Sequence, residues 1–189
     1  MNYILSLITF LPLLGALIIG LFVQGSDAQA SDNAKRVSLV TSIIVFLLSI
    51  VMFSEFDKTS SDFQFIEEFL WLGFFNYKLG VDGISVILIL LTTGMMPIVF
   101  LSSWTTNKRV KEYLISFLIL ETLMVGVFVS LDIFLFYVFF EAGLIPMFLI
   151  IGIWGGKERV FASFKFFLYT LLGSILMLIA MIVMWDISG

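Results

Sequence analysis

The chain has 189 residues, of which 61% are hydrophobic and 13% are charged, and its formal net charge is −4. Soluble domains usually carry about twice this share of charged residues, and the mean hydropathy of +1.15 indicates an integral membrane protein. The sequence contains no cysteine and no histidine, which excludes disulfides and removes the usual ligands of iron–sulfur clusters, zinc and haem. We therefore expect no cofactor and no metal in this chain, and no nucleic-acid partner.

Apolar runs recur along the chain, and most have the roughly 17 to 25 residues of a transmembrane helix. The first run, 4–23, can cross about 30 Å of hydrocarbon. It lacks the basic leader and short apolar core of a signal peptide, so we expect it to be retained. The other runs are 37–53, 84–101, 113–130, 133–153 and 161–185. No run shows the alternation of a membrane β-barrel, so the sequence predicts an all-α polytopic membrane protein with six transmembrane helices.

The connections between the runs differ in charge. The first, third and fifth connections hold most of the basic residues, namely Lys35, Arg36, Lys108, Arg109, Lys111, Lys157 and Arg159. The second connection is mainly acidic, and the fourth is a short turn around Asp132. By the positive-inside rule the odd connections are cytoplasmic, so both ends of the chain face the opposite side.

The second connection, 54–83, is the only sizeable segment outside the predicted spans. Its stretch FQFIEEFLWLGFFNY is too aromatic for a solvated linker, so we expect 54–83 to lie at the membrane interface. Asp82, in GVDGIS directly before the third run, has the residue type and position of a helix N-cap. Capping, rather than transport, is the role that this position predicts.

Two glutamates fall inside the apolar runs: Glu121 in LILETLMVGVF and Glu141 in LFYVFFEAGLIPMF. Residue counting places Glu121 about 12 Å and Glu141 about 18 Å from the cytoplasmic ends of adjacent antiparallel helices. Burial raises a carboxyl pKa and a nearby cation lowers it, so a glutamate under both influences can exchange a proton near neutral pH. A proton relay is one interpretation of these residues. The alternative is a protonated glutamate that is hydrogen-bonded in helix packing.

Pro146 lies five residues after Glu141. Proline lacks an N–H and clashes with the carbonyl four residues earlier, which here belongs to Ala142. The freed carbonyl lies beside Glu141 and could anchor a water. A kink that serves only helix packing explains Pro146 equally well.

Lys165 is a third candidate for the relay. It lies about 6 Å from the start of the last run, where snorkelling to the cytoplasmic surface is the ordinary role of a lysine. Its depth differs from that of Glu141 by roughly 12 Å, so contact would need bridging water. Ser163, Thr170 and Ser174 share a helical face, and they either line a wet path or bond to backbone carbonyls.

The stretch LFYVFFEAGLIPMFLIIGIWGGKERVFASFKFFLYTLLGSILML, together with LGVDGIS, resembles the antiporter-like membrane subunits of respiratory complex I, the proton-pumping NADH:quinone oxidoreductase (subunit M, or mitochondrial subunit four). The resemblance runs through nearly the whole chain and is strongest from Glu121 to Leu178. It implies a membrane-arm subunit that binds no redox cofactor and moves protons when quinone is reduced elsewhere. It also implies a bacterial or mitochondrial inner membrane, with the lipid bilayer and the other membrane-arm subunits as partners.

The resemblance carries over to the candidate residues. Glu141 matches the key glutamate of the family on the fifth helix, which is thought to pair with a lysine on a later, broken helix. Glu121 matches an acidic position on the fourth helix, and Lys165 matches a lysine on the sixth. Family members contain two inverted repeats, so the resemblance implies that this chain corresponds to an N-terminal portion and that the partner lysine lies beyond Gly189.

Two other functions stay open at this point. A subunit of a cation/proton antiporter complex would have the same antiporter-like fold, although GVDGIS and FFEAGLIPMF favour complex I. A purely structural membrane subunit would hold neighbouring subunits together. In that case neutralising Glu141 would change assembly and not turnover.

Overall fold

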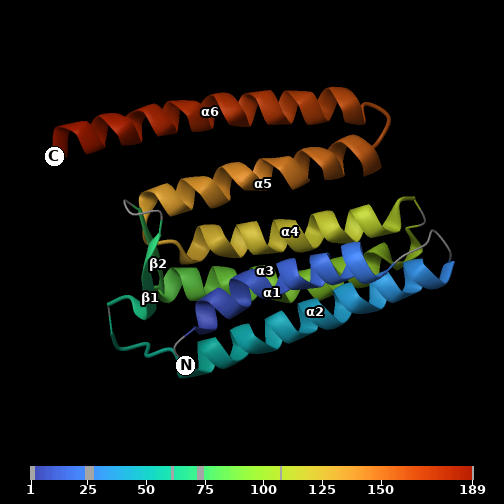
Figure 1. Ribbon diagram of the computed structural model, residues 1–189, viewed down its shortest axis with the longest axis horizontal. Coiled ribbons are helices and arrows are strands. Elements are labelled where there is room, and N and C mark those ends of the chain that lie inside the picture. Colours follow the sequence, from blue (N-terminus) through green and yellow to red (C-terminus); the bar gives the residue numbers. More distant parts are fainter. Residues whose placement is uncertain (1–2, 24–27, 61, 72–74, 107, 189) are drawn as a thin grey trace.

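The computed structural model describes residues 3–23, 28–60, 62–71, 75–106 and 108–188. Within these ranges, six long helices lie side by side in an elongated bundle with a β-hairpin at one end (Figure 1). The helices are α1 (Ile4–Phe22), α2 (Ala28–Glu55), α3 (Gly83–Ser102), α4 (Val110–Val129), α5 (Ile133–Trp154) and α6 (Arg159–Ser188). All of them are long and apolar enough to cross a membrane, and this confirms the predicted fold class.

Helix α2 extends well beyond the apolar run that predicted it, and α6 extends a few residues beyond its run. Helix α2 begins at Ala28, nine residues before the run 37–53, and α6 ends at Ser188, three residues after the run 161–185. A hydropathy window marks the part of a helix that lipid surrounds, whereas the hydrogen-bonded helix continues into polar sequence such as Ala28–Arg36.

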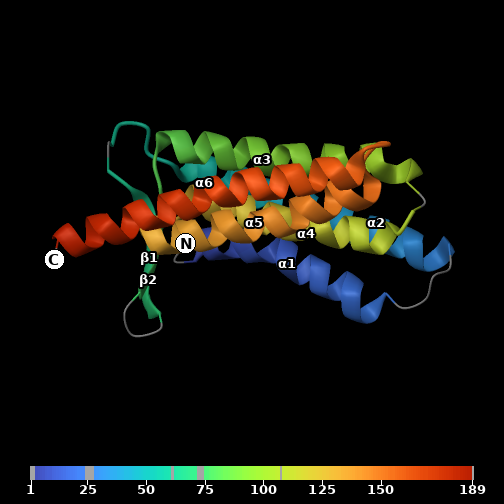
Figure 2. The ribbon, with the colours of Figure 1, turned by 90° about the horizontal axis from the view of Figure 1, so that it is seen from above.

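The first four helices form the core, and the last two extend it on one side. Helix α1 packs between α2 and α4, while α5 packs on α4 and α6 packs on α5. Figure 1 shows the resulting order, with α6 at the edge of the bundle, and in Figure 2 α6 lies in front of α5 and α4. One apolar cluster near the hairpin includes Ile8, Val45, Ile89 and Val125, and a second towards the opposite end includes Ile19, Ala34, Phe100 and Leu114.

The segment that we expected to be interfacial forms a two-stranded antiparallel hairpin, which the sequence analysis did not anticipate. Strand β1 (Gln64–Trp71) pairs with β2 (Phe75–Val81). Leu79 and Val81 are fully buried in the nearby apolar cluster, and the N–H of Leu131 donates to the carbonyl of Lys78 at 2.9 Å. The hairpin therefore packs against one end of the helix bundle.

Carboxylates cap the starts of α1, α3 and α5 at the hairpin end. Asp82 accepts from the N–H of Ser85 at 2.7 Å, as predicted, and Asp132 accepts from the N–H of Leu135 at 2.9 Å. The cap of α1 comes from the hairpin, because Glu67 accepts from the N–H of Leu5 at 2.8 Å. Each carboxylate satisfies free N–H groups at the positive end of a helix dipole.

Lysines bind the other ends of the same three helices. Lys111 donates to the carbonyl of Val23 after α1 at 2.6 Å. Lys35 donates at 2.7 Å to the carbonyl of Trp104, in the 3₁₀ turn η1 (Ser103–Thr105) after α3, and Lys108 donates at 2.8 Å to the carbonyl of Ile153 near the end of α5. Lysine at a helix C-terminus is favourable for free carbonyls and for the dipole. The lysines that make these connections basic therefore also cap the C-terminal ends of the helices.

Candidate functional site

Glu121 lies in the middle of α4 and is completely buried. It stands 11 residues after Val110, or about 17 Å from the lysine-rich end of the helix. Among the described residues, neither of its carboxyl oxygens has a hydrogen-bond partner. Leu118 belongs to the apolar cluster towards the lysine-rich end and Val125 to the cluster near the hairpin. Glu121 therefore lies between the two apolar clusters.

Thr122, the next residue, is a polar group that the sequence analysis missed. Its side chain is 3% exposed, and its hydroxyl also lacks a hydrogen-bond partner among the described residues. The sequence feature that could have revealed Thr122 is its position next to Glu121 inside an apolar run. Most buried polar groups in proteins are hydrogen-bonded to protein or to water, so this pair is a candidate site for bound water.

Glu141 lies at a similar depth on α5. It stands 13 residues before Trp154, or about 20 Å from the same end of the bundle. The residue is partly buried, and its Oε2 atom is buried without a hydrogen-bond partner among the described residues. Phe148, seven residues later on the same helical face, contacts Phe164 and Phe167 of α6. Glu141 therefore lies on the side of α5 towards α6.

The two glutamates lie on opposite sides of the contact between α4 and α5. At this contact Gly126 of α4 faces the ring of Phe139 on α5. Glu121 is five residues from Gly126 and therefore lies about 140° around α4 from this contact. Glu141 is two residues from Phe139 and lies about 200° around α5 from it. The structure thus gives both glutamates similar depth but does not place their carboxyl groups together.

Two residues that follow Glu141 on α5, Gly143 and Pro146, loosen the helix or its packing. Pro146 lies inside α5 and cannot donate to the carbonyl of Ala142. A Cβ atom added to Gly143 would meet nothing within 4 Å. A carbonyl without its helical donor therefore adjoins Glu141, whereas the open Gly143 lies about 200° around the helix from it, on the side of the α4–α5 contact.

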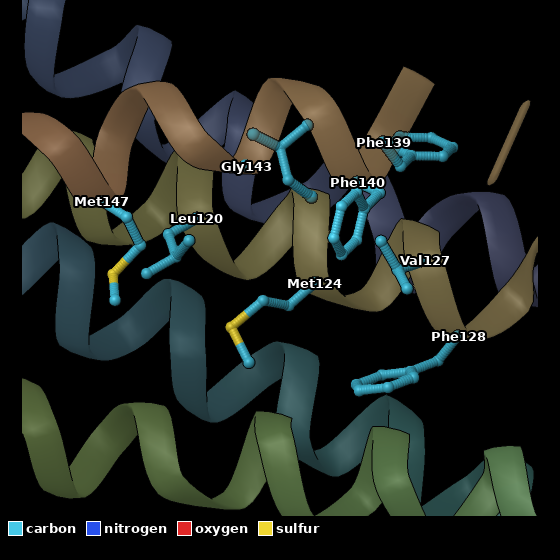
Figure 3. A pocket seen from close by; sticks show the side chains of 9 residues that line it. Leu120, Met124, Val127, Phe128, Phe139, Phe140, Gly143 and Met147 are labelled. Carbon is cyan, nitrogen blue, oxygen red and sulfur yellow. The ribbon is translucent and has the colours of Figure 1, made fainter. Parts of the chain in front are cut away.

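An apolar pocket of about 270 Å³ opens between α4 and α5. Figure 3 shows that α4 supplies Leu120, Met124, Val127 and Phe128, and that α5 supplies Phe139, Phe140, Gly143 and Met147. Leu120 precedes Glu121 and Phe140 precedes Glu141, but neither glutamate lines the pocket. The pocket is adjacent to the site and does not join the two carboxyl groups.

The structure does not bring Lys165 to Glu141. Lys165 is exposed, and its Nζ lies 6.0 Å from the centre of the Phe161 ring on its own helix. Ser163 faces α5, because a Cβ on Gly152 would lie 3.3 Å from its Oγ. Lys165 follows by two residues, or about 200° around the helix, and so lies on the side of α6 away from α5.

The hydroxyl groups on the inner face of α6 are all bonded to their own helix. Ser163 donates to the carbonyl of Val160 at 2.9 Å, Thr170 to that of Phe166 at 2.8 Å and Ser174 to that of Leu171 at 2.9 Å. Of the two alternatives raised by the sequence, the structure shows backbone bonding.

A bundle of membrane-length helices with buried ionisable residues is typical of membrane proteins that move ions or protons. The sequence comparisons identify the kind of membrane protein that the chain resembles. Residues 130–189 match the family model described as NADH:quinone oxidoreductase/Mrp antiporter, TM. NADH-quinone oxidoreductase subunit M of Rhodobacter capsulatus is 54% identical over 189 residues, which are 100% of this chain and 37% of that protein.

Mitochondrial relatives are nearly as similar. NADH-ubiquinone oxidoreductase chain 4 is 51% identical in Mycosarcoma maydis, over 96% of this chain and 38% of the relative. In Arabidopsis thaliana it is 45% identical, over 98% of this chain and 37% of the relative. The chain is thus similar along nearly its whole length to subunit M and chain 4, and it spans somewhat more than a third of the length of these relatives.

Solved structures show the same fold. A chain of respiratory complex I from Thermus thermophilus with bound NADH superposes with a TM-score of 0.76 and 26% identity, covering 93% of this chain and 34% of that one. A chain of the archaeal membrane-bound sulfane sulfur reductase superposes with a TM-score of 0.75 over 93% of this chain and 35% of that one. Its identity of 18% shows a likeness of fold alone.

Proposed function

We propose that this chain is part of a proton-translocating membrane-arm subunit of NADH:quinone oxidoreductase, in which Glu121 and Glu141 are resting positions for protons. The observation that carries the proposal is the burial of Glu121 with both carboxyl oxygens lacking a partner among the described residues. An isolated ionised carboxylate is very costly in an apolar interior. A glutamate retained only for packing would be expected to find a hydrogen-bond donor.

Transfer between the two glutamates requires intervening groups. Because they lie at similar depth on opposite sides of the α4–α5 contact, a proton would pass between them through water molecules. The hydroxyl of Thr122, which lacks a partner among the described residues, and the carbonyl of Ala142 are groups that such water could bind. Lys165 would take part from the exposed side of α6, together with an element packed against that side.

The redox chemistry of such a complex would belong to other subunits. This chain would respond to it through changes in charge near its buried carboxyl groups, and its partners would be the neighbouring membrane-arm subunits and the lipid. In a bacterial or mitochondrial inner membrane, the end that holds Lys35, Lys108 and Lys111 would face the cytoplasm or matrix, in accordance with the positive-inside rule. The hairpin and the N-terminus would face the opposite side.

A cation/proton antiporter complex is the second candidate, because the matching family description includes Mrp antiporters. The two candidates differ in what should co-purify with an affinity-tagged chain. We expect a flavin, iron–sulfur clusters and NADH:quinone oxidoreductase activity. Sodium extrusion by the purified complex without NADH oxidation would instead support the antiporter and contradict our proposal.

A further inference from the structure

A second feature of the bundle, separate from the pocket between α4 and α5, is a groove of about 460 Å³ between α1 and α2. Leu14 and Ile18 of α1 and Val40 and Ile44 of α2 line it, and these side chains are 44–55% exposed. The helices approach closely beneath it, because a Cβ on Gly15 would lie 2.8 Å from the Thr41 side chain. The groove is therefore a shallow apolar slot on the outer surface of the membrane-spanning part.

The groove has one charged end. Its lining runs from Leu11 to Ile18 on α1 and from Arg36 to Ile44 on α2, a length of about 11 Å along the helices. Helices α1 and α2 are antiparallel, because Ile8 shares a cluster with Val45 and Ile19 shares one with Ala34. Arg36 therefore lies at the Ile18 end. Ile18 is four residues before the end of α1, or about 6 Å. Arg36 is thus at headgroup depth on the lysine-rich side.

Arg36 differs from the lysines around it. Lys35, Lys108 and Lys111 each donate to a backbone carbonyl. Arg36 is exposed, and no hydrogen bond or ion pair joins it to another described residue, including Asp32 one turn earlier. A guanidinium binds phosphate through paired, charge-assisted hydrogen bonds, and basic residues at the cytoplasmic surface attract anionic lipids.

We propose that the α1–α2 groove binds one anionic phospholipid, with an acyl chain along Leu14, Ile18, Val40 and Ile44 and its phosphate on Arg36. Charge complementarity favours this occupant over an apolar helix. A covering helix would remove the guanidinium from water without supplying a counter-charge, which is costly, whereas a lipid supplies both the hydrocarbon and the phosphate. The proposal is independent of proton transfer through Glu121 and Glu141.

Photolabelling tests the proposal on the purified 189-residue chain in phosphatidylcholine vesicles. The probes are phosphatidylglycerol and phosphatidylcholine with the same photoreactive acyl chain, and labelled residues are located by mass spectrometry. We expect the phosphatidylglycerol probe to label the groove residues of α1 and α2 roughly fivefold more than the phosphatidylcholine probe, the effect of one basic residue at the surface. Arg36→Gln should lower phosphatidylglycerol labelling to the phosphatidylcholine level, and Arg36→Lys should retain part of the preference.

Two further variants separate charge from shape. Arg159→Gln removes a cation at the same end of the bundle, on α6 and away from the groove, and should leave the labelling unchanged. Val40→Trp keeps Arg36 but fills the groove, and should lower labelling by both probes. Circular dichroism will verify that each variant keeps its helical content. Equal groove labelling by the two probes, an undiminished preference in folded Arg36→Gln, or groove cross-links between two copies of the chain would overturn the proposal.

Discussion

The backbone N–H of Leu5 donates a 2.8 Å hydrogen bond to Oε1 of Glu67, although 62 positions separate the two residues in the sequence. The N–H of Ser6 donates to Oε2 of the same carboxylate at 3.1 Å, and the Ser6 hydroxyl bonds to both Glu67 and Tyr77. Burial raises the pKa of Tyr77 above its usual range, so this phenol keeps its proton. The hairpin thereby supplies the N-cap that the sequence of α1 does not contain.

Removal of this cap should destabilise the bundle. Glu67 is 4% exposed, and Glu67→Ala leaves the N–H groups of Leu5 and Ser6 without their acceptor. We expect a loss of about 1–2 kcal/mol in the free energy of unfolding. The measurement is denaturant unfolding of the purified protein in detergent.

The adjacent residue offers a matched control. Glu68 lies on the other face of β1, and its ion pair with Lys78, at 3.0 Å, is exposed. Exposed ion pairs contribute roughly 0–1 kcal/mol, so Glu68→Ala should have a clearly smaller effect. Equal losses in the two variants would mean that the α1 cap contributes no special stability.

The cap of α3 should make stability depend on pH. The hydrogen bonds of Ser85 lower the pKa of Asp82 below its ordinary value of 3.8. A group whose pKa is lowered in the folded state contributes its full stabilisation above its unfolded-state pKa, and this contribution is lost as pH falls through the folded-state pKa.

Asp82→Ala should cost about 1 kcal/mol at neutral pH. Asp82→Asn keeps a capping oxygen, so the difference between wild type and Asp82→Asn should shrink below pH 3.8. Melting temperatures over this range test both expectations, and a constant difference would contradict the assignment.

Much of the helical architecture could be predicted from the sequence, because a membrane requires a run of apolar residues for each span. The cap at Asp82 was also predictable, since it lies next to the helix that it serves. Glu67 was grouped with the acidic residues of an interfacial segment. The capping role of Glu67 depends on Leu5 and Ser6, which come near it only in the folded chain. A local sequence pattern cannot predict a contact between residues so far apart in the sequence.

The candidate site was predictable in its residue types but not in its geometry. Glu121 and Glu141 were conspicuous because each interrupts an apolar run. Whether their carboxyl groups meet depends on how α4 and α5 rotate against each other. The contact of Gly126 with Phe139 sets that rotation and places the two glutamates on opposite sides.

That contact makes a prediction of its own. A Cβ on Gly126 would lie 2.6 Å from atoms of the Phe139 ring, so Gly126→Ala should force α4 and α5 apart. We expect a loss of about 1–3 kcal/mol from overpacking. Phe139→Leu should restore part of this loss in the double variant, as measured by thermal unfolding.

Gly143 on the facing helix is the control for Gly126. Since a Cβ there would meet nothing within 4 Å, Gly143→Ala should be neutral or should stabilise by up to about 1 kcal/mol through helix propensity. Comparable destabilisation by the two alanine substitutions would show that the Gly126–Phe139 contact does not set the spacing of α4 and α5.

The orientation in the membrane can be tested directly because the sequence has no cysteine. Two exposed positions suit the introduction of a single cysteine: Asp62, beside the hairpin, and Lys157, before α6. In intact bacterial cells an impermeant maleimide should label position 62, whereas position 157 should react only after the membrane is opened. Reaction of both positions from the same side would refute the proposed topology.

The central claim is that Glu141 and Glu121 hold protons in transit, and proton uptake driven by NADH in membrane vesicles tests it most directly. Glu141→Gln keeps the size and hydrogen-bonding capacity of the side chain but cannot ionise. In complexes that assemble normally, as verified by native gel, it should abolish or strongly reduce proton uptake and lower coupled quinone reduction. Glu141→Asp should retain part of the activity, and Glu121→Gln should have a milder effect. Parental proton uptake by an assembled Glu141→Gln complex would contradict the account and leave the buried carboxyl group as a packing feature.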